Sequence, residues 1–209
     1  MLAIIEAAGW PIWPIIAASI VALGIIGERS WSLRTSVVAP RELLAETLQE
    51  VRAKGVSTDL LSRLVQESSL GRIFAAGLRN SRSSREVMKE SIEEAGRGVT
   101  HELERFLTTL GTIASISPLM GLFGTVVGMI EIFASNAPTG TNPTQLAHGI
   151  SVALYNTGFG LVIAIPSMIF YRHFRGLVDS FVVEMELQAA RLVDMVHGER
   201  LENGEQARK

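Results

Sequence analysis

The chain has 209 residues, of which 47% are hydrophobic, with a formal net charge of -2 and no cysteine. This charge leaves no basic excess for binding nucleic acid, and the absence of cysteine excludes disulfides, thiolate chemistry and cysteine-ligated metals. The apolar residues are gathered into long uncharged runs, so the composition favours a membrane protein over an ordinary globular domain.

Three uncharged runs are long enough to cross a bilayer as helices, which takes about 20 apolar residues. We therefore predict an all-α membrane protein with transmembrane helices at residues 10–27, 106–134 and 149–171. The preceding residues 1–9 are predicted to form an amphipathic N-terminus on the outer side of the membrane. The first span has few polar residues and is expected to lie at the periphery, against lipid.

The distribution of basic residues predicts the orientation, because Lys and Arg in short loops stay on the cytoplasmic side. Of the 19 basic residues, 13 lie in residues 29–105 and 6 in residues 172–209, so none lies elsewhere. The N-terminus is therefore expected in the periplasm and the C-terminus in the cytoplasm. No basic region precedes the first apolar run, so that run is expected to be retained rather than cleaved as a signal peptide.

Residues 28–105 alternate short helical patterns with helix-breaking residues, which predicts a small helical lobe in the cytoplasm. One helix is expected between Pro40 and Gly55, and a second after a cap at Ser57 or Thr58. A short amphipathic helix follows. Charges of both signs and few apolar residues indicate a solvated surface over a thin core rather than a catalytic domain.

Two of the spans are expected to extend far into the cytoplasm. A helical pattern capped at Ser83 or Ser84 enters the second span without a turn-forming cluster. A continuous helix from there to residue 134 would be roughly 75 Å long. Gly96, Gly98 and Pro118 are the positions where it would bend.

The third span continues at helical period through residues 172–200 with an apolar stripe along one side. Such a stripe predicts that the extension packs against other helices, within the subunit and between subunits. The polar, turn-rich residues 135–148 are expected to form a short periplasmic loop, and residues 201–209 a disordered tail.

The second span is more than a lipid anchor. It carries hydroxyl side chains at membrane depth, where an unpaired hydroxyl is costly, and glycines that let neighbouring helices approach. Gly124 and Gly128 form a GxxxG pair. These features predict protein neighbours, and on their own they also fit a span whose polar residues only pack helices.

The outer half of the third span carries Ser151, Tyr155, Asn156 and Thr157. On helical geometry, the faces around Thr125 in the second span and Thr157 in the third are otherwise apolar or small. A ring of such faces would form an apolar tunnel with a narrow polar girdle, suited to holding another transmembrane helix rather than a water column. We expect the chain alone to conduct few ions.

Two sequence blocks, PLMGLFGTVVGMIEIF and GISVALYNTGFGLVIAIPSMIFYRHF, resemble the paired signature of the ExbB/TolQ/MotA proton-channel family, in its three-span ExbB and TolQ branch. The resemblance covers nearly the whole chain. It implies a pentameric bundle around a central pore in a Gram-negative inner membrane, enclosing the single spans of ExbD-like partners. Proton flow would then energise a TonB-like transducer, or its Tol equivalent, without a cofactor.

By the same resemblance, Thr125 and Thr157 match the pore-lining threonines that would lie beside the titrating Asp of the partner. A hydroxyl can donate and accept a hydrogen bond, so it can pass on a proton without ionising. The other candidates for pore lining or helix packing are small or polar residues of the two spans: Ser115, Pro118, Gly121, Gly124, Gly128, Ser151 and Asn156.

The chain departs from the family pattern at Val152, where ExbB and TolQ proteins usually carry Glu. The partner's Asp is then expected to be the sole ionisable stop. Glu131 is a candidate for a displaced acid, but it lies about 240° around the helix from Thr125. It is therefore assigned to the outer interface, where His148 is a candidate to pair with it.

Other functions remain open at this point. A flagellar MotA-like subunit would have four spans, a TolQ-like subunit would serve envelope maintenance instead of TonB-dependent transport, and a non-conducting scaffold would use its threonines only for packing. We do not expect an enzyme or a metal site. The chain has no metal-ligand spacing, no phosphate-binding or dinucleotide motif, and no nucleophile beside a base.

Overall fold

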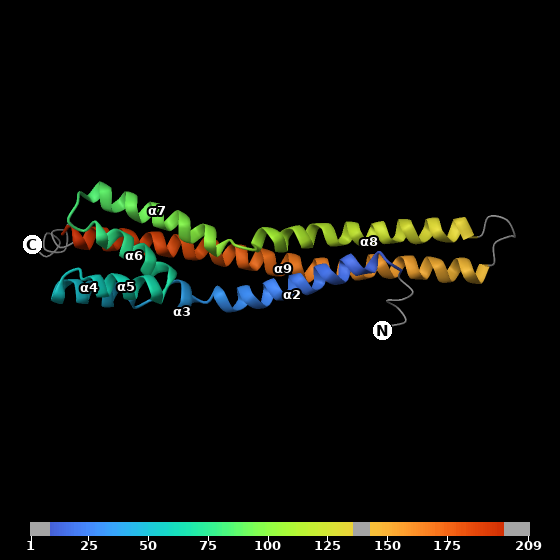
Figure 1. The fold of residues 1–209 in the computed structure, drawn as a ribbon, viewed down its shortest axis with the longest axis horizontal. Coiled ribbons are helices and arrows are strands. Elements are labelled where there is room, and N and C mark those ends of the chain that lie inside the picture. Colours follow the sequence, from blue (N-terminus) through green and yellow to red (C-terminus); the bar gives the residue numbers. More distant parts are fainter. Residues whose placement is uncertain (1–8, 136–142, 199–209) are drawn as a thin grey trace, which may run out of the picture. The chain divides into compact units, whose positions relative to one another are not determined.

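The computed structural model describes residues 9–135 and 143–198, and every regular element within them is a helix (Figure 1). The chain divides into two compact units. The span unit contains residues up to Arg29 together with Phe106–Phe174, and the helical lobe contains Ser30–Arg105 and the residues from Arg175 onward. The predicted N-terminal segment, the loop at 136–142 and the C-terminal tail lie outside the described residues.

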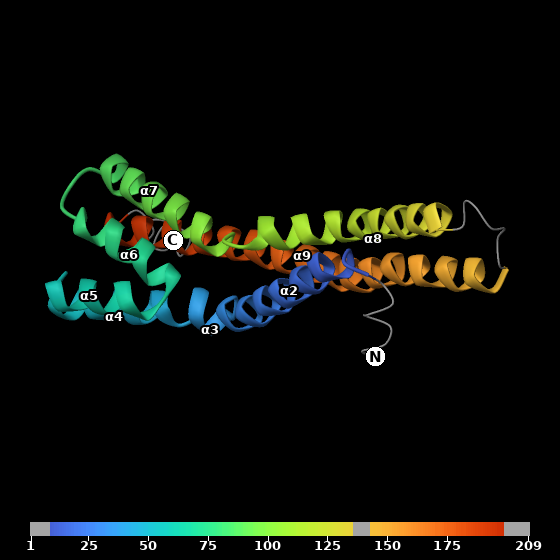
Figure 2. The same cartoon turned by 45° about the vertical axis from the view of Figure 1, so that its right-hand side comes forward.

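The span unit is built from α2 (Ile12–Ser32), α8 (Leu107–Ser135) and the first part of α9 (Pro143–Val196). Three segments are long and apolar enough to cross a membrane, Ile12–Ser32, Arg85–Ala134 and Gly149–Val196, which confirms the prediction of three candidate spans. Figures 1 and 2 show α8 and α9 side by side along the unit. Much of the apolar surface of these helices is exposed, as expected of helices surrounded by lipid or further protein.

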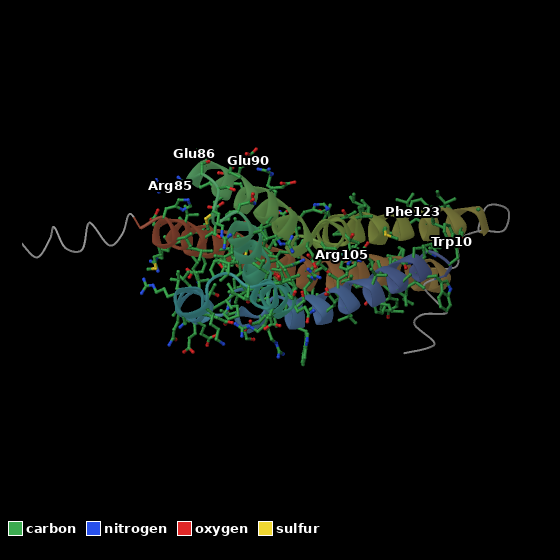
Figure 3. All side chains as sticks on the ribbon, turned by 60° about the vertical axis from the view of Figure 1, so that its left-hand side comes forward. Trp10, Arg85, Glu86, Glu90, Arg105 and Phe123 are labelled. Carbon is green, nitrogen blue, oxygen red and sulfur yellow. The ribbon has the colours of Figure 1, made fainter. Side chains whose placement is uncertain are left out.

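The first span contacts the second through aromatic side chains near the start of α2. The ring of Trp10 meets the ring of Phe123 on α8 edge to face, with 6.0 Å between centroids. Figure 3 shows the two labelled side chains at the same end of the span unit. This contact shows which side of α8 meets the start of the first span.

The helical lobe contains α3 (Thr35–Val38), α4 (Leu43–Lys54), α5 (Thr58–Glu67), α6 (Ser69–Arg79), α7 (Arg85–Leu103) and the second part of α9. Serine side chains cap three of these helices by accepting a hydrogen bond from a first-turn amide: Ser57 on α5, Ser68 on α6 and Ser84 on α7. The caps at Ser57 and Ser84 confirm two of the sequence predictions. Gly55, with φ +74°, ends α4 as expected.

The core of the lobe is formed by α6 against α5, α7 and α9. Its fully buried side chains include Phe74 and Leu78 of α6, Leu64 of α5 and Met88 of α7. From α9 come Val178, Phe181, Met185, Ala189 and Leu192, which confirms the predicted apolar stripe. Ion pairs at the two ends of α7, Arg85 to Asp194 at 2.8 Å and Glu104 to Arg175 at 3.0 Å, hold α7 along α9.

The second span does not continue the helix before it, contrary to the uninterrupted helix that the sequence suggested. Residues 104–106 form a turn between α7 and α8, whereas Gly96, Gly98 and Pro118 all lie within helices. Phe106 has φ +64°, the left-handed region that side chains other than Gly seldom adopt. The guanidinium carbon of Arg29 lies 5.7 Å from the centroid of the Phe106 ring, a cation–π contact that favours this conformation.

Candidate functional site

The contact between α8 and α9 is centred on glycines, which lack a side chain. A Cβ at Gly121 would lie 2.7 Å from the carbonyl oxygen of Asn156 and 2.9 Å from the Cα of Thr157. From the other side, a Cβ at Gly160 would lie 2.5 Å from the carbonyl oxygen of Ser117. The two backbones therefore approach closely, as small residues permit in membrane helices.

The contact continues outward along the same line. A Cβ at Gly124 would lie 2.7 Å from the Cβ of Asn156, which is only 1% exposed, and a Cβ at Gly128 would lie 3.4 Å from that of Ala153. As the residue number rises on α8 it falls on α9, so the two helices run antiparallel. The predicted GxxxG pair thus faces a helix of the same chain.

Thr125 and Thr157 lie on the same side of this contact. Each follows a contact residue in sequence, Thr125 after Gly124 and Thr157 after Asn156, and one residue turns a helix by about 100°. Viewed from one end, two antiparallel helices rotate in opposite senses as the chain advances, so both threonines turn away from the contact line in the same direction. Both are half-buried at this edge.

The surroundings of the two threonines are apolar and open. Leu122 on α8 is 55% exposed, and Leu154 on α9 is 62% exposed. Pro118, Met129 and Leu161 share the same edge on helical geometry. We call this surface, Pro118, Leu122, Thr125 and Met129 of α8 with Leu154, Thr157 and Leu161 of α9, the hydroxyl face.

The first span leaves the hydroxyl face uncovered at its contact with α8. Phe123, which meets Trp10 in the turn before α2, precedes Thr125 by two residues and therefore lies about 200° around the helix from it. The start of the first span thus contacts α8 on the far side from Thr125. The exposed edge of the α8–α9 pair is available to a further helix.

The hydroxyls of the two threonines differ in their hydrogen bonds. The Thr125 hydroxyl donates to the carbonyl of Leu122 at 2.6 Å. Within the described residues the Thr157 hydroxyl makes no hydrogen bond. Other hydroxyls of the two helices each donate to the backbone carbonyl four residues earlier: Thr112, Ser115, Ser117 and Ser151. Thr157 therefore offers both a donor and an acceptor to whatever lies against the hydroxyl face.

The remaining predicted residues are placed as follows. Ser115 and Ser151 are exposed, and Glu131 is exposed near the end of α8. The side chains of His148 and Val152 lie outside the described residues. Among the residues that the structure describes, no three His, Cys, Asp or Glu side chains are grouped to hold a metal ion.

Among the described residues, the two ionisable groups with clearly shifted pKa values belong to the helical lobe. A hydrogen bond and the charge of Glu50 raise the pKa of Arg63. A hydrogen bond from its own backbone amide, with a smaller contribution from the Ser84 hydroxyl, lowers the pKa of Glu86 at the start of α7. The face itself offers hydroxyls and apolar groups rather than a charge of its own.

Sequence reasoning identified the two threonines and named Asn156 and three glycines of α8 as candidates for helix packing, but it missed Ser117 and Gly160. These two residues complete the close contact that Asn156 fills from α9. A usable signal was present, because Asn156 and Gly160 stand four residues apart, like Gly124 and Gly128, and so lie on one face of the helix.

Comparison with known proteins gives a consistent result. The model of the MotA/TolQ/ExbB proton channel family matches residues 65–187. The chain is 30% identical to the ExbB-like 3 protein of Synechocystis sp., over 78% of this chain and 80% of that protein. It is also 30% identical to the biopolymer transport protein exbB1 of Vibrio cholerae, over 75% of this chain and 71% of that protein. Identity to the biopolymer transport protein ExbB of Salmonella typhimurium is 29%, over 86% and 77% of the two chains.

Proposed function

Because the chain belongs to the MotA/TolQ/ExbB proton channel family, we propose that it is an ExbB-like subunit of a proton-driven motor, and that its hydroxyl face lines the proton pathway. The observation that carries this proposal is the pair of threonines on one open edge of the α8–α9 contact. The Thr157 hydroxyl is uncommitted there, although an unpaired hydroxyl in an apolar surround costs free energy. A partner helix against this face would satisfy it.

The proposed partner is a single-span, ExbD-like protein whose carboxyl group titrates beside Thr157. The threonine hydroxyl can donate to a carboxylate and accept from a carboxylic acid, so it stabilises both protonation states. It can also hold a water molecule that passes the proton on, without ionising itself. With Val152 in place of an acid, the partner's carboxyl group is the ionisable stop on this path.

The proposed assembly is a pentamer in a Gram-negative inner membrane, with the hydroxyl faces turned inward and α2 outward against lipid. The N-terminus lies in the periplasm and the helical lobe in the cytoplasm, following the distribution of Lys and Arg. Each proton that crosses yields about 2.3 kcal/mol per 100 mV of membrane potential. This energy would drive a TonB-like transducer, with a Tol-like role in envelope maintenance as the alternative. The names of the relatives, biopolymer transport proteins, support a transport role.

The test is proton flux into liposomes under an imposed potential, with and without the ExbD-like partner. The informative variant is Thr157→Val, which keeps the shape of the side chain and removes the hydroxyl. Thr112→Val is the matched control, because the Thr112 hydroxyl donates to the carbonyl of Thr108 and lies about 220° around α8 from Thr125. Flux that requires the partner, falls in Thr157→Val and persists in Thr112→Val supports the proposal.

Two results would contradict it. Flux from this chain without a partner would show that the apolar face does not need a charge from elsewhere. Equal flux per complex in wild type and Thr157→Val, with less partner retained on purification, would identify Thr157 as a packing residue outside the proton pathway.

A further inference from the structure

A groove between α4 and α9 of the helical lobe has the form of a binding site for a helix. Its volume is about 660 Å³, and two helix faces line it. From α4 and the turn before it come residues at helical spacing: Arg41, Leu44, Ala45, Leu48, Gln49, Arg52 and Ala53. Glu184, Gln188, Arg191 and Met195 of α9 form the other wall. The nine residue steps from Leu44 to Ala53 along α4 give this wall of the groove a length of roughly 14 Å.

The groove has an apolar floor and a basic rim. Leu44, Leu48 and Met195 provide apolar surface between the two helices, while Arg41, Arg52 and Arg191 are exposed beside it. Over the described part of the chain, none of these three arginines makes an ion pair. The carboxylate of Glu184 is bound by the side-chain amide of Gln188 at 2.7 Å. The net charge at the rim is therefore positive and uncompensated.

A buried polar group at the groove is also unsatisfied. Gln188 is only 4% exposed, and within the described residues its Oε1 atom accepts no hydrogen bond. A buried acceptor without a donor destabilises the protein, so a partner that supplied a donor here would be stabilising. The groove thus combines an apolar floor, free positive charge and an open acceptor.

The complementary surface is present on the same chain, on α7. Glu86, Glu90 and Glu94 are exposed at intervals of four residues, which places them along one side of the helix. Figure 3 shows the labelled Glu86 and Glu90 on the outer side of α7. Val87 is an exposed apolar residue beside them, and a Cβ at Gly98 would meet no atom within 4 Å.

We propose that the α4–α9 groove binds the acidic side of α7 from a second copy of this chain. Glu86 to Glu94 spans roughly 12 Å and Arg41 to Arg52 roughly 16 Å, so long arginine side chains can reach carboxylates along the same helix. Val87 then packs on the apolar floor, as in other complexes of an amphipathic helix in a groove. Because the groove and α7 are different surfaces, the contact is head to tail, the type that closes into rings.

This interface rests on the proposed function only in placing the second copy within the same assembly. The chain contains no cysteine, so pairs of introduced cysteines report contacts without background. Two variants would be co-expressed, one with Leu48→Cys in the groove and the other with Val87→Cys on α7. The membranes would then be oxidised. The matched control replaces Val87→Cys by Val65→Cys, an equally exposed valine on α5 that does not line the groove.

We expect disulfide-linked dimers from the Leu48→Cys and Val87→Cys mixture, several-fold above the Val65→Cys mixture. Adding Arg52→Glu should lower the yield, and Glu90→Arg on the other copy should restore it, because the pair regains opposite charges. Yields equal to the Val65→Cys control, or dimers from Leu48→Cys alone, would overturn the interface. An acidic lipid or another protein in the groove would give the first of these results. The assay does not measure flux, so either proposal can fail alone.

Discussion

The most direct test of the close backbone contact between α8 and α9 is a series of Gly→Ala substitutions along it. At Gly121 the new Cβ would lie 2.7 and 2.9 Å from backbone atoms of Asn156 and Thr157, whereas apolar contacts are most favourable at about 3.5–4.0 Å. Backbone cannot rotate away, so the helices must move apart, and overpacking of this kind costs about 1–3 kcal/mol. At Gly158 nothing lies within 4 Å, so alanine there should be neutral or slightly stabilising.

Two further glycines should fall between these limits. At Gly124 the close atoms belong to the Asn156 side chain, which can adjust at a lower cost than backbone, and at Gly128 the nearest atom is at an ordinary 3.4 Å. The expected order of destabilisation is therefore Gly121, Gly124, Gly128 and then Gly158. Unfolding by SDS in mixed micelles, followed by far-UV circular dichroism, measures it. A Gly121→Ala protein as stable as Gly158→Ala would refute the close contact and, with it, the placement of Thr157.

Three other predictions concern single positions. Phe106→Gly should unfold at a higher temperature than Phe106→Ala and be more stable by about 1 kcal/mol, because both lose the ring but only glycine adopts φ +64° without cost; equal stability would contradict a left-handed residue here. Ser68→Ala should destabilise the start of α6 by about 1 kcal/mol, seen as about fivefold faster hydrogen exchange of the Gly71 amide, whose bond to the Ser68 hydroxyl is lost; unchanged exchange would argue against this cap. Because the pKa of Glu86 is lowered by folding, its contribution to stability is present above about pH 4.5 and lost as the pH falls through the folded value. Glu86→Gln should therefore be less stable than wild type at pH 7 and equally stable in acid, as measured by circular dichroism. A difference in stability that stays constant with pH would count against this linkage.

The features that follow from hydrophobic periodicity and capping chemistry could be predicted from the sequence. The three candidate spans, the caps at Ser57 and Ser84 and the buried stripe of α9 are confirmed. The family resemblance of the two motif blocks is confirmed as well. Each of these depends on residues close together in the chain, where spacing alone fixes which side chains share a face.

The features that depend on contacts between distant residues could not be predicted. The helix break at Phe106 is not marked by Gly or Pro in the sequence. The Phe106 ring makes a cation–π contact with Arg29, which is far away in sequence. The sequence offered Gly96 and Gly98 as bends, but a single glycine in a helix lowers its stability without requiring a break. Likewise, threonine spacing alone could not reveal that Thr125 bonds to its own helix while Thr157 does not.

The close α8–α9 contact and the absence of charge on the hydroxyl face explain one another in the proposed mechanism. A fixed carboxylate on this face would cost about 2.5–3.5 kcal/mol at the bilayer centre, and it would be present in every copy of a ring. A carboxyl group on a central partner lies beside one subunit of the ring at a time. Only that subunit has to stabilise its charged and neutral forms. That subunit needs a hydroxyl in a constant position, and the glycines provide it, because a helix pair in backbone contact at Gly121 and Gly160 leaves Thr157 little freedom to shift. The polar groups that tune the pathway can therefore be few, provided that the apolar contact beneath them is rigid.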